Sequence, residues 1–239
     1  MVKESLPSLS YTVCLQKFLN FIYRWFTGAG GTIHAYLHFE QEFKTNVWAI
    51  QVTPDTLKNS LYDQARFYFY KVKEQQPEGP YRLAAYSGTS MLVIPLAQML
   101  QESGGTIIQL AFIDHFPTLL FCPAIGVQIK GNGPVDVGPA TRRTFLFTSP
   151  TISGGAFNGN PNSEFIATFF DTMNVLLNNV FDFIMSLVET HGPTGVLDNL
   201  VGWIESVKAP ITLYVASQGT VGDALPEYLD QWGDLGAKL

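Results

Sequence analysis

The sequence predicts an α/β fold, with a mainly parallel sheet that carries helices on both faces. Short apolar segments of the strand type alternate with segments of helical periodicity, which is the pattern of βαβ units. The chain has 239 residues and 46% of them are apolar, which is enough for one substantial buried core. It has no repeat with a period of about 20 to 50 residues, which excludes solenoids and repeat arrays.

Helices are expected where apolar residues recur every three to four positions. Residues 61–74 show this spacing and are followed by Pro77, which cannot continue a helix. The other expected helices are 33–42, 91–100 and 201–207.

Strands are expected where short runs of apolar, β-branched and aromatic residues lie between turn residues. The expected strands are 47–52, 81–86, 106–113 and 210–216. Residues 21–26 are a candidate for a further strand, in which Arg24 is an unfavourable residue.

A long segment between the last two of these strands reads as an insertion. Residues 123–161 are rich in Gly, Pro, Ser and Asn, and the most apolar long stretch, residues 165–188, follows them. Asp171 and Asp182 interrupt this stretch, and each would cost about 3 kcal/mol near the centre of a bilayer. We therefore expect an amphipathic helix and no membrane span, within a helical lid insertion at about 123–192.

Charge and cysteine content exclude several classes of partner and set an expected location. The formal net charge is -6 and no basic run is longer than the pair Arg142 and Arg143, which argues against nucleic acid and anionic membranes as partners. The two cysteines, Cys14 and Cys122, are too few for a disulfide framework and too far apart for a metal clamp. Residues 1–23 lack the features of a signal peptide. We expect a cytoplasmic protein without a metal.

The motif that carries chemistry lies between the expected strand 81–86 and the expected helix 91–100. Its residues read Ala85-Tyr86-Ser87-Gly88-Thr89. In a nucleophile elbow a serine occupies a strained strand-to-helix turn, and small residues two positions before and after it let the two elements approach closely. Here Ala85 and Thr89 hold those positions. The alternative interpretation is that Ser87 is only the N-cap of the helix.

The sequence around this motif closely resembles the type I thioesterase domains that end fatty acid synthases, polyketide synthases and peptide synthetases. The resemblance is clearest in residues 76–87, the approach to the serine. Upstream, residues 28–32 are similar to the family's glycine-rich oxyanion loop, and residues 110–114 are similar to the strand that delivers its acid. The resemblance implies an α/β-hydrolase fold for residues 28–239, after a divergent N-terminal segment at residues 1–27.

The same resemblance implies roles for four residues. Ser87 matches the nucleophile and Asp114 the acid that orients a histidine base, while the backbone N–H groups of Gly88 and Ala29 match the two oxyanion donors. The implied substrate is an acyl chain held as a thioester, on the phosphopantetheine arm of an acyl carrier protein or on CoA. No other cofactor is implied.

Alternatives remain open for several of these assignments. The glycine loop could be only a tight turn, and Asp114 could be a turn residue ahead of Pro117. Asp223 is a rival acid, because some α/β-hydrolases place theirs after the penultimate strand. We interpret His115 as a loop residue.

The sequence has no histidine where the family has its base. After Asp114 the sequence contains only His115 and His191, whereas the family's histidine follows the last strand. We therefore expect the C-terminal strand and helix to be truncated in this chain. Two hypotheses follow: a hydrolase that releases acyl chains through Ser87, or a catalytically impaired relative that acts as an acyl-binding or scaffold domain. A third is another serine esterase or acyltransferase of the same fold.

Overall fold

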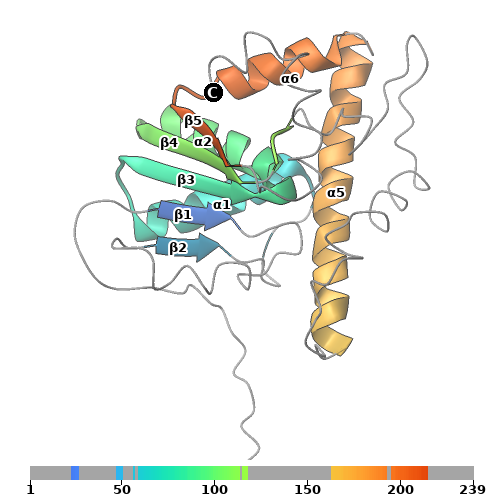
Figure 1. The fold of residues 1–239 in the computed structure, drawn as a ribbon, viewed down its shortest axis with the longest axis horizontal. Coiled ribbons are helices and arrows are strands. Elements are labelled where there is room, and N and C mark those ends of the chain that lie inside the picture. Colours follow the sequence, from blue (N-terminus) through green and yellow to red (C-terminus); the bar gives the residue numbers. More distant parts are fainter. Residues whose placement is uncertain are drawn as a thin grey trace, which may run out of the picture.

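The computed structural model describes residues 23–26, 47–50, 56, 59–113, 115–117, 163–192 and 195–214. Within these ranges five strands form one parallel sheet in the order β2-β1-β3-β4-β5 (Figure 1). The strands are β1 (Tyr23–Phe26), β2 (Val47–Ile50), β3 (Tyr81–Tyr86), β4 (Ile107–Ile113) and β5 (Ile211–Tyr214). The predicted parallel sheet is confirmed.

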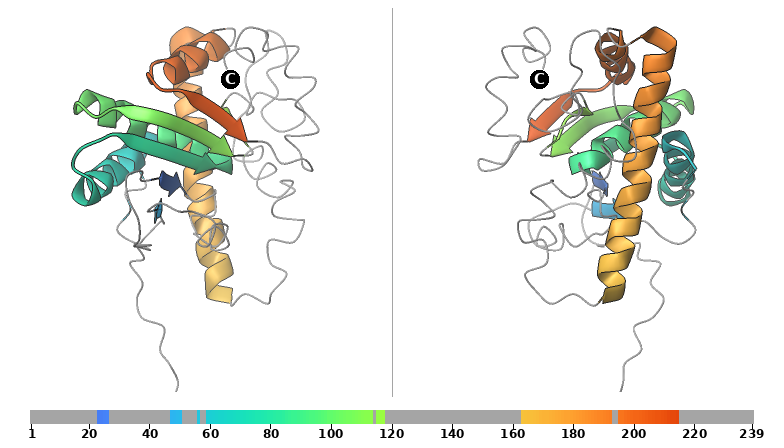
Figure 2. Two further views of the ribbon diagram at one scale, coloured as in Figure 1. Left: turned by 60° about the vertical axis from the view of Figure 1, so that its left-hand side comes forward. Right: turned by 90° about the vertical axis from the view of Figure 1, so that its right-hand side faces the viewer.

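The helices of the described part are α1 (Leu61–Gln75), the short 3-10 helix η2 (Ser87–Thr89), α2 (Ser90–Glu102), α5 (Ser163–His191) and α6 (Val196–Glu205). Helices α1 and α2 pack against each other on one face of the sheet (Figures 1 and 2). Helix α6 is joined to α2 by side-chain hydrogen bonds, such as the one from Gln98 Nε2 to Ser206 Oγ at 2.6 Å.

Helix α1 forms where the sequence combines a cap with an apolar stripe. The Ser60 hydroxyl accepts a hydrogen bond from the Asp63 N–H at 3.0 Å, which satisfies one of the free amides of the first turn. Leu61, Ala65 and Val72 are buried on the face that meets the core. In the aromatic run 67–70 of α1, Tyr68 is buried and Tyr70 is exposed, as expected for residues on different faces of a helix.

Helix α2 is the centre of the core. Its residues Val93, Ile94 and Leu96 are fully buried, and each contributes about 1.5–3 kcal/mol of hydrophobic stabilisation. The helix therefore tolerates Pro95 in its interior, which costs about 3 kcal/mol through the lost hydrogen bond and the clash with the preceding turn.

Helix α5 runs past the end of the sheet to which the strand arrows point (Figure 1). It contacts α1, α6 and η2, so it lies beside the turn that follows β3. From Asp171 onward it buries apolar residues such as Met173 and Leu176 and exposes Asp171 and Asp182, as an amphipathic helix does. Within the part of the chain that is described, no helix is long and apolar enough to cross a membrane.

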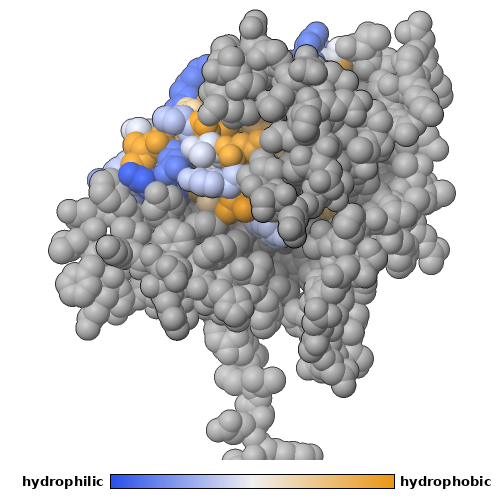
Figure 3. All heavy atoms as spheres, viewed as in Figure 1, coloured by the Kyte–Doolittle hydropathy of each residue, from blue (hydrophilic) through white to orange (hydrophobic). Residues whose placement is uncertain are grey.

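The described surface is mixed in polarity where it can be seen in the view of Figure 1. Figure 3 shows apolar and hydrophilic residues side by side on the described surface in the view of Figure 1. This agrees with β5, in which three residues are half-buried and Tyr214 is exposed.

The expected element bounds hold with small differences. The strand 81–86 is found as predicted, and α1 and α2 extend the predicted helices by a few residues. Helix α6 begins five residues before the predicted start at 201 and ends before 207. Residues 23–26, placed by sequence in the N-terminal segment, form β1 between β2 and β3 despite Arg24. The predicted helix 33–42 lies outside the described residues, as does most of the insertion before residue 163.

Candidate functional site

Ser87 lies in the turn between β3 and α2. Its backbone φ is +55°, a left-handed conformation that non-glycine residues rarely adopt. Ala84 and Ala85, at the end of β3, are fully buried, which leaves room for α2 to approach the strand. Ser87 itself is half-buried. The local geometry is the strained strand-turn-helix arrangement that the motif predicts.

The structure does not support the N-cap interpretation of Ser87. The cap residue of η2 is Tyr86 and that of α2 is Thr89, and neither makes a side-chain cap hydrogen bond. The Thr89 hydroxyl instead donates to the Tyr86 carbonyl oxygen at 2.8 Å. Ser87 therefore stands just ahead of a long helix, where the positive end of the helix dipole favours developing negative charge.

The strand register brings the carboxyl ends of β3 and β4 to the same edge of the sheet. Tyr86 of β3 pairs with Ile113 of β4, so Ser87 and Asp114 follow directly after paired residues of neighbouring parallel strands. The carboxyl ends of parallel strands are where α/β proteins build their sites. Asp114 itself lies outside the described residues, as do Ala29 with the glycine loop 28–32 and the rival acid Asp223.

His115 is buried against the helix that carries the elbow. Its Nδ1 atom lies 2.6 Å from the Ser90 hydroxyl oxygen, and both side chains are buried. Burial lowers the pKa of His115 from 6.5 to about 4, because the charged imidazolium loses its hydration, so the ring is neutral at pH 7. The sequence interpretation as a loop residue missed this contact. The one signal of this contact in the sequence is that His115 directly follows Asp114 at the end of an expected strand.

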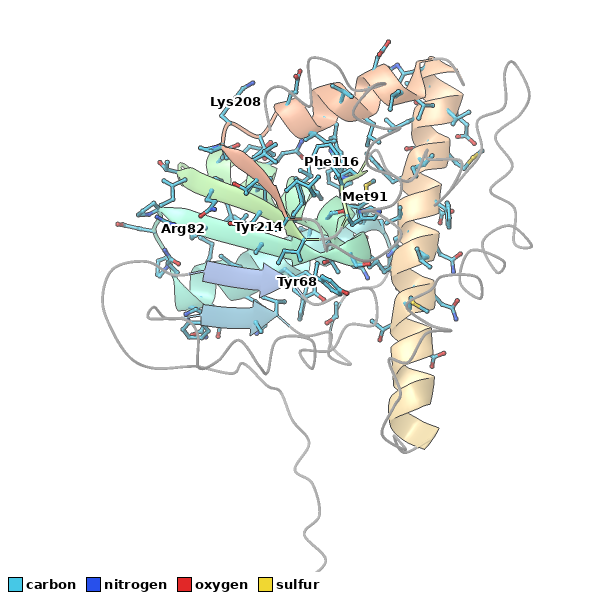
Figure 4. The ribbon with its side chains drawn as sticks, viewed as in Figure 1. Tyr68, Arg82, Met91, Phe116, Lys208 and Tyr214 are labelled. Atoms are coloured by element: carbon cyan, nitrogen blue, oxygen red, sulfur yellow. The ribbon has the colours of Figure 1, made fainter. Side chains whose placement is uncertain are left out.

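Buried apolar side chains also lie on the elements around the elbow. Phe116 packs edge-on against Phe112 with ring centroids 5.3 Å apart. In Figure 4, Phe116 and Met91 lie toward the end of the sheet nearest α5, whereas Arg82 lies toward the opposite end of β3.

His191 is exposed in the last turn of α5. No group of metal-ligating side chains occurs among the residues that the structure describes.

The segment that builds this site is similar to known proteins. Residues 24–120 match the family model "Thioesterase domain". A highly reducing polyketide synthase, stpks1 of Strobilurus tenacellus, is 44% identical over 98 residues, which are 41% of this chain and 3% of that protein. The polyketide synthase PksR of Bacillus subtilis (strain 168) is 28% identical over 94 residues, 38% of this chain and 4% of that protein. The chain thus spans only a few per cent of the length of these relatives.

Solved structures show the same fold at low sequence identity. A four-domain nonribosomal peptide synthetase, holo-AB3403, matches with a TM-score of 0.54 and 14% identity, over 93% of this chain and 20% of that chain. The Vlm2 thioesterase domain matches with a TM-score of 0.51 and 14% identity, over 88% of this chain and 93% of that chain. The chain has the α/β-hydrolase fold, and its residues 24–120 are similar to the thioesterase domain family and to segments of two polyketide synthases.

Proposed function

We propose that this chain releases acyl chains from thioesters, with Ser87 as the nucleophile. The observation that carries the proposal is the half-buried residue Ser87 at a left-handed turn between β3 and α2, inside the segment that matches the thioesterase family model. A serine held in this way presents its oxygen ahead of the helix N-terminus, where an incoming carbonyl group can be polarised.

The proposed reaction has two steps. In the first, the Ser87 oxygen loses its proton to a base and bonds to the thioester carbonyl carbon; the carbon–sulfur bond then breaks and the thiol leaves with that proton. In the second, water attacks the resulting serine ester, which releases the carboxylic acid and restores Ser87. The resemblance assigns the base to a histidine after the last strand, but this sequence has no histidine after His191, so no residue of it is assigned this role.

The oxyanion of each tetrahedral intermediate needs two hydrogen-bond donors. The proposed donors are the backbone N–H of Gly88, next after the nucleophile, and that of Ala29 in the glycine loop. A donor of this kind contributes roughly 3 kcal/mol to transition-state stabilisation. Asp114 would orient the base from the end of β4, because it follows a residue paired with Tyr86.

The substrate class follows from the relatives. Both curated relatives are polyketide synthases, so we propose an acyl chain bound to the phosphopantetheine arm of an acyl carrier protein, or to CoA. Helix α5 contacts η2 and would form an apolar wall for the acyl chain. A cytoplasmic location, and the need for no cofactor beyond the substrate's own carrier group, remain predictions.

Turnover of thioesters by matched variants tests this proposal. Purified protein is offered acyl-CoA and acyl-carrier-protein thioesters, and thiol release is measured for the wild type, Ser87→Ala and Ser103→Ala. Ser103 bonds the Leu100 carbonyl oxygen at the far end of α2, so its variant controls for the loss of a serine hydroxyl. We expect Ser87→Ala to lower kcat by about 10⁴-fold or more and Ser103→Ala to have little effect. Full turnover in Ser87→Ala contradicts the assignment.

The second candidate is an impaired relative that binds acyl chains without turning them over. The state of the two described histidines favours it: His115 is buried on Ser90, and His191 is exposed at the end of α5. This candidate predicts binding of a non-hydrolysable acyl thioether without thiol release from the thioester. Turnover that depends on Ser87 excludes it, and a preference for simple esters over carrier thioesters would favour an esterase of the same fold.

A further inference from the structure

A buried polar pair lies at the start of α2, three residues after the proposed nucleophile. The Ser90 hydroxyl oxygen and His115 Nδ1 are 2.6 Å apart, although the two residues are 25 positions apart in the chain. Ser90 is the first residue of α2, and His115 is the second residue after β4. The contact therefore joins the start of the elbow helix to the end of the neighbouring strand.

This pair is not a second nucleophile and base. None of the surface of Ser90 is exposed, so an acyl carbonyl group cannot reach its oxygen. His115 is also buried, with 7% of its surface exposed. Ser87, three residues before Ser90, is the serine with accessible surface in this turn. The hydrogen bond is internal to the protein, and its effect on chemistry must act through other residues.

The main chain of Ser90 connects the pair to Ser87. The Ser90 N–H donates to the carbonyl oxygens of Ser87 and Gly88, so the residue that holds His115 also closes the turn of the nucleophile. On the other side, His115 directly follows Asp114 in the chain. Phe116, the next residue, is fixed against Phe112 of β4. A displacement of Ser90 would thus disturb the turn at Ser87, and a displacement of His115 would disturb the chain just after β4.

We propose that the hydrogen bond between Ser90 and His115 is a positioning contact that fixes the turn at Ser87 relative to the end of β4. This inference rests on the proposed function for its catalytic consequence, but not for its structural one. A neutral imidazole has one donor and one acceptor nitrogen, so Nδ1 either accepts a hydrogen bond from the Ser90 hydroxyl or donates one to it, according to the tautomer. The low pKa of His115 keeps the ring in that neutral form throughout the neutral pH range.

The test compares variants that remove the bond with variants that keep a polar partner. Ser90→Ala and His115→Leu remove it, His115→Asn places an amide near the position of Nδ1, and Ser103→Ala removes an unrelated hydroxyl from the same helix. Two readouts are used: kcat and KM for an acyl-CoA thioester, and hydrogen exchange of the amides of residues 87–90, 115–117 and 61–75.

We expect Ser90→Ala and His115→Leu to lower kcat by up to about 100-fold with KM nearly unchanged, because a small misplacement of reacting groups costs rate more than binding. Amides of residues 87–90 and 115–117 should exchange faster, while those of α1 keep their wild-type rates. His115→Asn should recover part of kcat, and Ser103→Ala should match the wild type in both readouts.

Three results would overturn the inference. The first is wild-type kcat in both Ser90→Ala and His115→Leu. The second is unchanged exchange at residues 87–90 in these variants, and the third is faster exchange that includes α1 equally, which indicates a purely structural role. If the wild type shows no turnover that depends on Ser87, the proposed function fails instead, and the exchange pattern alone decides whether the positioning contact exists.

Discussion

Ser87 keeps a backbone conformation that opposes the intrinsic preference of its residue type. A left-handed conformation costs an L-residue with a Cβ about 1–2 kcal/mol relative to the right-handed one. Strain of this kind persists where the surrounding structure holds it, and it is common at active sites. The buried residues on both sides, Ala85 of β3 and Ser90 of α2, fix the turn between them.

This strain predicts that two variants of Ser87 lose activity equally but differ in stability. Ser87→Gly and Ser87→Ala should both abolish turnover, because neither has a hydroxyl. Glycine adopts a positive φ without strain, so Ser87→Gly should be about 1 kcal/mol more stable than Ser87→Ala after its larger loss of chain entropy is subtracted. Urea unfolding of the two variants measures the difference, and equal midpoints would show that the turn is unstrained.

Burial of His115 predicts that acid destabilises the fold. The pKa is about 4 in the folded state and 6.5 when the ring is exposed, so between these values the unfolded chain binds a proton that the folded chain does not. Stability should therefore fall as the pH drops from about 6.5 to about 4, by roughly 3 kcal/mol in total.

The contribution of His115 to this pH dependence of stability can be isolated with a matched pair of variants. His115→Asn removes the buried titrating ring, whereas His191→Asn removes an exposed one at the end of α5. In urea unfolding between pH 7 and 4, His115→Asn should lose stability less steeply than the wild type, and His191→Asn should follow the wild type. Equal slopes for all three proteins would contradict the burial of a neutral His115.

At the scale of elements, the segment from α1 to β4 could be predicted closely from the sequence. Its helices have apolar residues at helical spacing, and Pro77, Gly79 and Pro80 separate α1 from β3. Helix α6 was recognised only in its second half. The buried residues Val196, Leu200 and Ile204 repeat every four positions and could have shown the earlier start. Pro193 and Gly195 just before Val196 are typical of a turn, and the cap residue Gly195 has no side chain that could signal the start of a helix.

The junction between α2 and β4 depends on a glycine. A Cβ at Gly105 would lie 2.6 Å from Cε2 of Tyr81 and 2.7 Å from the Leu100 carbonyl oxygen. Tyr81 is fully buried in β3, so its ring cannot withdraw without disturbing the core. Gly105 therefore permits the close packing that sets α2 against the strand leading to Ser87.

Substitution of this glycine should destabilise the domain, in contrast to a glycine in open space. We expect Gly105→Ala to cost about 1–3 kcal/mol through overpacking. Gly202→Ala, in α6, meets nothing within 4 Å and should be neutral or stabilising by up to about 1 kcal/mol, because alanine favours a helix. Thermal unfolding of both variants measures the contrast, and equal melting temperatures would contradict the close packing at Gly105.

At the scale of the whole molecule, three helices that are distant in sequence meet at one aromatic cluster. The Trp203 Nε1 of α6 donates to the Tyr62 hydroxyl of α1 at 3.0 Å, and its ring centroid lies 4.7 Å from that of Phe183 in α5. Tyr62 and Phe183 also meet edge-on. This cluster ties α5, the helix beside the elbow, to the rest of the fold.

Loss of the cluster should loosen α5 and destabilise the domain. We expect Trp203→Ala to cost about 2 kcal/mol, less than a fully buried tryptophan because Trp203 is only half-buried. The control is Tyr70→Ala, which removes an aromatic side chain that is 64% exposed and should change stability by less than about 0.5 kcal/mol. Chemical unfolding provides the comparison, and equal effects of the two substitutions would show that the cluster does not hold α5.

The sequence predicted the fold class and the strand-turn-helix arrangement at Ser87, but only the tertiary structure reveals the contact between Ser90 and His115. Ser87 was recognisable because its neighbours form a local motif between a strand and a helix. Ser90 and His115 are far apart in the chain, and they meet only because β3 and β4 pair in the register that sets Tyr86 beside Ile113. A contact fixed by strand pairing leaves no local pattern in the sequence.

The most direct test of the central claim is the site at which the protein is acylated or phosphonylated. The wild type and Ser87→Ala are treated with a serine-directed fluorophosphonate and with an acyl-CoA thioester, and the adducts are located by intact mass measurement and peptide mapping. The account predicts one adduct on the wild type, on the peptide that contains Ser87, and none on Ser87→Ala. An adduct that persists in Ser87→Ala, or that maps to another serine of the wild type, would contradict it.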